Sequence, residues 1–138
     1  MKLVIALFLL AYQPLVDDPV HIPKMGDDFT ITFTGAELIH NHHVGNDWVY
    51  YVQIDQDKLY RGDHAQVTVA LNQTITISCF LFETNEKHLD SATKTVEWDR
   101  ADLLVSKNDE LYVDVTIREG NGRYAGNTAQ MRFFFTVH

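Results

Sequence analysis

The sequence contains a single cysteine, Cys79, among its 138 residues. One cysteine excludes an internal disulfide and any zinc site built from paired cysteines. A chain of this length corresponds to one domain and can bury a hydrophobic core without disulfide crosslinks. Cys79 alternates with Ile77 and Leu81, so we expect a buried side chain and not a catalytic thiol.

Basic residues are also scarce. Lysine and arginine together number 11, against 19 aspartates and glutamates, which gives a formal net charge of −8. The chain has no run of basic residues, whereas nucleic acids and anionic membranes select for clustered lysine and arginine. The sequence therefore predicts an acidic protein that binds neither nucleic acid nor anionic membranes.

Long hydrophobic runs are absent except at the N-terminus. Lys2 precedes an unbroken apolar stretch at residues 3–11, which is too short to span a bilayer. A charged residue followed by an apolar core of about 7 to 15 residues is the layout of a secretory signal. This layout predicts a secreted protein, extracellular or periplasmic. The alternative is an apolar first strand that is retained in the fold.

Proline is confined to the segment that follows this run, at Pro14, Pro19 and Pro23. We therefore interpret residues 1–27 as a signal-like segment with an extended leader. From Asp28 onward, apolar and polar residues alternate strictly, as they do in half-buried strands. Residues 28–138 are predicted to form the single domain.

The alternating segments predict about eight short strands with little or no helix. They fall at residues 29–33, 48–54, 65–71, 75–81, 96–98, 111–117 and 131–137, with a short hairpin strand at 59–61. The best helical candidate, residues 98–109, is predicted to be a loop. Many short strands separated by turns are typical of an antiparallel β-sandwich, C2-like or immunoglobulin-like.

If every strand crosses the sandwich, successive loops alternate between its two ends. We call the end reached by the first strand the far end and the opposite one the near end. The loops predicted at the far end are residues 40–47, 61–64, 83–92 and 119–127. They contain His40, His42, His43, His64 and His88. The aspartates predicted at the near end are Asp27, Asp28, Asp55, Asp57, Asp99, Asp102 and Asp109.

The far-end histidines have two interpretations. In an extended chain His40 and His42 lie on one face, and His64 or His88 could complete a zinc or copper site with them. The alternative is an exposed loop at residues 40–43, with a Gly-Asn turn before a strand that begins at Trp48. The second interpretation implies no metal cofactor.

The eight-strand pattern with acidic loops, over residues 28–138, resembles C2-type β-sandwich domains. The resemblance implies calcium bound by loop aspartates, and the candidate ligands are Asp55, Asp57, Asp99 and Asp102. This chain departs from the family pattern because it lacks spaced aspartates in two facing loops. The alternative assigns the same aspartates to turns and solubility, and we expect no tight calcium site.

These features favour a non-catalytic recognition module that binds a protein or glycan through its end loops. The candidate binding residues are His40, His42, His43, His64, His88 and Tyr124. Tyrosine in loops and on polar faces is typical of recognition surfaces. One alternative is an assembly subunit whose apolar N-terminal segment adds as a strand to a neighbouring sheet. The other is a metal-binding C2-like module. Oligomeric state is not predicted.

Overall fold

The structure is a computed structural model that describes residues 25–84 and 89–138. The predicted signal-like segment and leader up to residue 24 lie outside the described residues, as does His88. Within the described ranges, no helix is long and apolar enough to cross a membrane.

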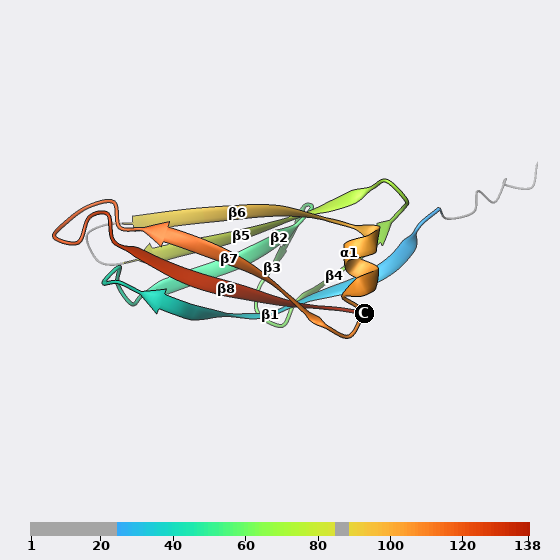
Figure 1. The fold of residues 1–138 in the computed structure, drawn as a ribbon, viewed down its shortest axis with the longest axis horizontal. Helices are drawn as coiled ribbons and strands as arrows, with labels where there is room; N and C mark the ends of the chain where they lie inside the picture. Colours follow the sequence, from blue (N-terminus) through green and yellow to red (C-terminus); the bar gives the residue numbers. More distant parts are fainter. Residues whose placement is uncertain (1–24, 85–88) are drawn as a thin grey trace, which may run out of the picture.

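Two four-stranded antiparallel sheets pack face to face and form a β-sandwich (Figure 1). The first sheet has the order β4 (His64–Val69), β1 (Asp27–Asn41), β8 (Thr128–Val137) and β7 (Glu110–Arg118). The second has the order β3 (Asp57–Leu59), β2 (Trp48–Ile54), β5 (Thr74–Thr84) and β6 (Leu89–Asp99). The predicted all-β sandwich of about eight strands is confirmed.

The core lies between the inner faces of the two sheets. Period-two alternation places every second residue of β5 and β8 inward, and these apolar side chains are buried. Phe33 of β1 stacks with Phe133 of β8, with ring centroids 5.8 Å apart, and Tyr50 of β2 meets Phe133 edge-on at 5.8 Å. The first pair lies within one sheet, and the contact between Tyr50 and Phe133 joins the two layers.

Strand β1 is longer than the alternation predicted. Its pairing with β8 continues to Asn41, but the register shifts between Phe33 and Gly35 and again between Leu38 and His40. Each shift moves the following residues to the other face, so the alternation breaks while the hydrogen-bonded ladder goes on. His40 is therefore a half-buried strand residue, which corrects its predicted place in an exposed loop.

Two further elements differ from the prediction. Strand β6 covers 11 residues, because a sheet edge can carry polar side chains that show no apolar alternation. Residues Arg100–Val105 form a short helix, α1, where a loop was predicted. Asp99 caps its first turn, and Leu103 is fully buried. Leu71, predicted as a strand residue, is 76% exposed in the β4–β5 turn.

The assumption that every strand crosses the sandwich is wrong for β3, which has only three residues. The chain turns back halfway along the molecule, and the loop at 61–64 packs beside the middle of β1. There the Gly62 amide donates to the Phe33 carbonyl at 2.7 Å. His64 pairs with Thr32. This places His64 away from the far end, contrary to the prediction from loop alternation.

Candidate functional site

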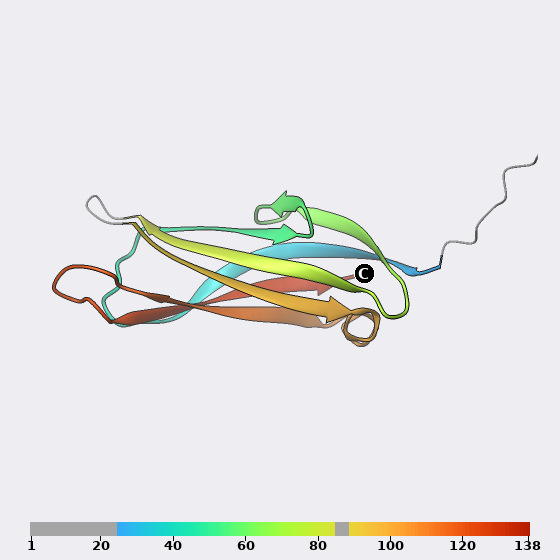
Figure 2. The same cartoon turned by 90° about the horizontal axis from the view of Figure 1, so that it is seen from above.

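Two loops meet at the far end, where β1 ends and β8 begins. They are the β1–β2 loop, residues 42–47, and the β7–β8 loop, residues 119–127, which lie at the left of Figures 1 and 2. The His42 amide donates to the Thr128 carbonyl at 3.0 Å, which continues the β1–β8 pairing into the loops. The two sheets therefore bring both loops to one end of the sandwich.

The β1–β2 loop is held by its own side chains. Asn41 donates from Nδ2 to the Gly45 carbonyl at 2.6 Å and accepts at Oδ1 from the Val44 amide at 2.8 Å. Val44 is buried in the core, with 1% of its surface exposed. His43 adopts a positive φ of 61°, a conformation that histidine tolerates better than most residues. The predicted turn is thus an ordered structure, closed by one amide side chain.

An open hollow of about 470 Å³ lies between these loops. Its lining residues are Asn41, His43, Val44, Gly45, Asn46, Glu119 and Tyr124. The rings of His43 and Tyr124 stack with centroids 5.1 Å apart and planes 20° from parallel. The Cζ atom of Arg123 lies 5.6 Å from the Tyr124 ring. Aromatic walls with a few amide and carboxyl groups are a common composition for ligand sites.

The structure divides the predicted histidine cluster into separate parts. His40 and His42 stack on each other at 4.9 Å, and His43 turns to Tyr124 instead. His64 is opposite Thr32, eight positions along β1 from His40, or about 26 Å in an extended strand. Among the residues that the structure describes, no three His, Cys, Asp or Glu side chains are grouped to hold a metal.

A buried carboxyl group, Glu83 at the end of β5, packs against Gly45, which is one of the residues that line the hollow. Its side chain is 0% exposed, and neither carboxyl oxygen has a hydrogen-bond donor among the residues that the structure describes. If Gly45 carried a Cβ atom, that atom would lie only 2.2 Å from Oε1 of Glu83. The Glu83 carboxyl group therefore packs directly against the Gly45 backbone. Gly45 also has a φ of 118°, which other residues rarely adopt. Glu83 therefore contacts a lining residue of the hollow and does not itself line it.

Two more acidic side chains are buried at the same end. Asp90 of β6 is directly opposite Glu83 in the β5–β6 register and is 6% exposed. Its Oδ1 accepts from the Gly120 amide at 3.0 Å, and within the described part of the chain its Oδ2 has no donor. Glu119, which lines the hollow, is 8% exposed. The sequence interpretation considered Asp90 only as a possible metal ligand beside the histidines. It missed Glu83 and Glu119, although Glu83 continues the inward series of β5 after Leu81.

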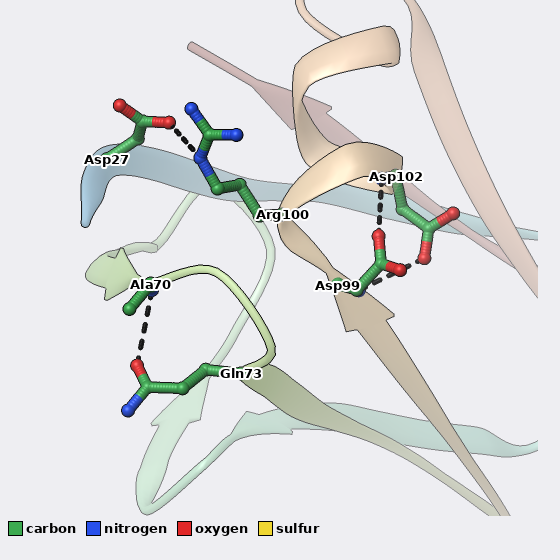
Figure 3. A network of polar contacts seen from close by, with 6 residues as sticks. All are labelled: Asp27, Ala70, Gln73, Asp99, Arg100 and Asp102. Carbon is green, nitrogen blue, oxygen red and sulfur yellow. Dashed lines mark hydrogen bonds and ion pairs between the residues drawn. The ribbon is translucent and has the colours of Figure 1, made fainter. Parts of the chain in front are cut away.

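The near end carries two of the aspartates that the C2-type resemblance had suggested as calcium ligands, Asp99 and Asp102 (Figure 3). Asp99 accepts from the Asp102 amide at 2.8 Å, and Asp102 accepts from the Asp99 amide at 3.0 Å, so the pair caps α1. Asp27 forms an ion pair with Arg100 and ties β1 to the helix. These carboxylates have structural partners already.

The other predicted calcium ligands lie on the β2–β3 hairpin. Asp55 accepts from the Thr76 amide of β5 at 3.0 Å, and Asp57 is the exposed first residue of β3. Strand β5 lies between this hairpin and Asp99 on β6. The structure thus places the two aspartate pairs on opposite sides of a strand.

Outside the far end, the Cys79 thiol is buried and the Tyr51 ring contacts other side chains of the protein. Burial raises the pKa of the Cys79 thiol to about 12, so this thiol stays protonated and is a poor nucleophile. Tyr51 stacks with Phe80 on the outer face of the second sheet at 4.7 Å, and Nζ of Lys58 lies 3.8 Å from the Tyr51 ring centroid. These rings contact the chain's own side chains.

The hollow at the far end therefore brings the stacked rings of His43 and Tyr124 together with the side chains of Asn41, Asn46 and Glu119. Neither a scan against protein-family models nor a search of curated proteins finds a match to this chain.

Proposed function

We propose that this chain is a non-catalytic recognition module, secreted from the cell that makes it, which binds a protein or glycan in the far-end hollow. The observation that carries the proposal is the stacked His43–Tyr124 pair, which forms an aromatic wall of that hollow. Asn41, Asn46 and Glu119 add amide and carboxyl groups around it. Aromatic rings with convergent polar groups supply contact area and orientation together.

The C2-type likeness belongs to this proposal as a likeness of architecture alone. Calcium is no part of it, because Asp99 and Asp102 cap a helix and Asp55 accepts from a strand amide. Binding would then depend on the loop side chains and need no cofactor. A non-catalytic role agrees with a Cys79 thiol that is buried and protonated.

The proposal is tested by probing oligosaccharide and peptide arrays with the full chain, Tyr124→Ala and Tyr112→Ala. Tyr112 is a matched control, an exposed tyrosine on the outer face of β7. We expect the native chain to bind members of at least one array. Tyr124→Ala should lose about tenfold or more of that affinity, and Tyr112→Ala should keep it. Absence of any ligand on both arrays, or full binding by Tyr124→Ala, would contradict the proposal.

A further inference from the structure

We propose a second binding site, on the outer face of the first sheet, for a small zwitterion. Such a ligand has one carboxylate and one ammonium group joined by a short apolar body. The site is an open hollow of about 320 Å³, and the lining residues that bear on its chemistry are Gly35, Glu37, Arg61, Glu110 and Phe134. It shares no lining residue with the far-end hollow, so the two sites are independent.

The hollow forms where β1 bulges beside β8. The register between these strands shifts between Phe33 and Gly35. At the shift, the Thr34 hydroxyl donates to the Phe134 carbonyl at 3.1 Å. Gly35 has a φ of 151° and no side chain, so it leaves bare backbone next to Phe134, its half-buried register partner. A glycine inside a strand often marks a bulge or a place where a ligand comes close to the backbone.

Arg61 lies over this bare backbone and comes from the β3–β4 turn, which is fixed to β1. The Gly62 amide donates to the Phe33 carbonyl at 2.7 Å, and the Phe33 amide donates to the Asp63 carbonyl at 3.0 Å. A Cβ atom added to Gly35 would lie 3.3 Å from Nε of Arg61 and 3.6 Å from its Cδ. The Arg61 guanidinium forms no hydrogen bond or ion pair with any residue that the structure describes. The hollow therefore contains a positioned cation that has no partner.

Two glutamates line the same hollow with the opposite charge. Glu110 begins β7 and Glu37 lies on β1, and both side chains are exposed. Strand β8 separates β7 from β1, and Arg61 reaches β1 from the side of β4, so Glu110 and Arg61 approach the hollow from opposite sides. Across the described ranges, neither glutamate is ion-paired with Arg61. A cation and a carboxylate thus face the hollow separately, with the Phe134 ring and open backbone between them.

A small zwitterion matches this distribution of charge. Its carboxylate would accept from the Arg61 guanidinium, whose planar donors suit carboxylates. Its ammonium group would donate to Glu110, with Glu37 adding negative charge nearby, and its apolar body would cover the Phe134 ring. A ligand with one charge would gain a partner on one side of the hollow and meet a like charge on the other. The volume is at the small end of the range for ligand sites, which suits a molecule the size of an amino acid.

The first test uses ε-aminocaproate, a zwitterion with an apolar body, and two matched compounds that each lack one of its charges, caproate and hexylamine. Calorimetry measures the binding of each compound to the native chain. We expect ε-aminocaproate to bind, and caproate and hexylamine to bind about tenfold more weakly. Failure of ε-aminocaproate to bind, or equal binding by either matched compound, would overturn the proposal.

Variants then assign the two sides of the hollow. Arg61→Gln and Glu110→Gln should each weaken ε-aminocaproate binding about tenfold, because each removes the partner of one charge. Arg118→Gln is the control, because Arg118 is exposed at the other end of β7 and does not line the hollow. It should leave binding unchanged, as should Tyr124→Ala at the far end. Full binding by Arg61→Gln or Glu110→Gln, or an equal loss in Arg118→Gln, would contradict the site. Loss of ε-aminocaproate binding in Tyr124→Ala would place the zwitterion in the far-end hollow and so also overturn it.

Discussion

Asp114 of β7 and Arg132 of β8 form an ion pair on the outer face of the first sheet. Nε of Arg132 lies 2.7 Å from Oδ1 of Asp114, and Nη2 lies 2.8 Å from Oδ2, so the contact is bidentate. The Arg132 guanidinium also lies 4.0 Å from the Tyr112 ring centroid. The hydrogen bonds from Arg132 hold the pKa of Asp114 below its ordinary value.

This pair gives a pH-dependent contribution to stability. Because the pKa of Asp114 is lower in the folded chain than in the unfolded one, its stabilisation is complete above the unfolded value of about 3.9. The stabilisation is lost as the pH falls through the folded value. We predict that Asp114→Asn lowers the free energy of unfolding slightly at pH 7 and by less at pH 3, which is below the unfolded value. Urea titrations at both pH values measure this, and an equal loss at both would contradict it.

At the scale of elements, the strands were predictable where one face is apolar and the other polar. Strand β5 is the clearest case, because its inward residues from Ile75 to Leu81 are all buried. Strand β6 could be predicted only at its Trp98 end, since most of this edge strand is exposed. The bulges of β1 hid its last residues, because period-two patterns cannot continue across a shifted register.

Part of the candidate site could also be predicted from the sequence. His43 and Tyr124 were expected in loops of the same end, and the structure stacks them. His64 was misplaced because the short hairpin strand was assumed to cross the whole sandwich, whereas β3 has only three residues and the chain turns back beside β1. Glu83 was missed because a charged residue within an inward-facing series is easily assigned to the loop that follows it.

The helix α1 depends on its N-terminal cap. Asp99 and Asp102 exchange hydrogen bonds between side chains and amides, which satisfies donors that the first turn of a helix leaves open. We predict that Asp99→Ala lowers the free energy of unfolding by about 1 kcal/mol. Asp109→Ala, in the exposed turn after the same helix, is the control and should have little effect. Chemical denaturation of the two variants makes the comparison, and equal losses would count against the cap.

At the scale of the whole molecule, stability comes from burial between the sheets. Phe133 is 0% exposed and packs against Phe33 and Tyr50, so truncation would leave a cavity. We predict that Phe133→Ala costs about 3 to 5 kcal/mol of unfolding free energy. The adjacent Phe134 points to the outer face and is half-buried, so Phe134→Ala should cost clearly less. Similar losses for both variants would contradict the assignment of inner and outer faces.

The same rigid sandwich fixes the far-end loops, because their ends continue the pairing of β1 with β8 and of β7 with β8. The Asn41 clamp and the buried Val44 then hold the loop between β1 and β2 in place. A hollow supported in this way needs little rearrangement to bind, which lowers the entropic cost of recognition.

The most direct test of a recognition site at the far end is a two-dimensional ¹H–¹⁵N NMR titration of the labelled chain. One titration uses an octapeptide that alternates glycine with arginine, and a separate one uses a neutral glucose hexasaccharide. At least one of them should shift amide signals that concentrate at residues 41–46 and 119–124. Signals from the outer face of β2 and β5, around Tyr51 and Phe80, should stay in place. Shifts that gather on that face or at the near end, or no shifts with either probe, would contradict a recognition site at the far end.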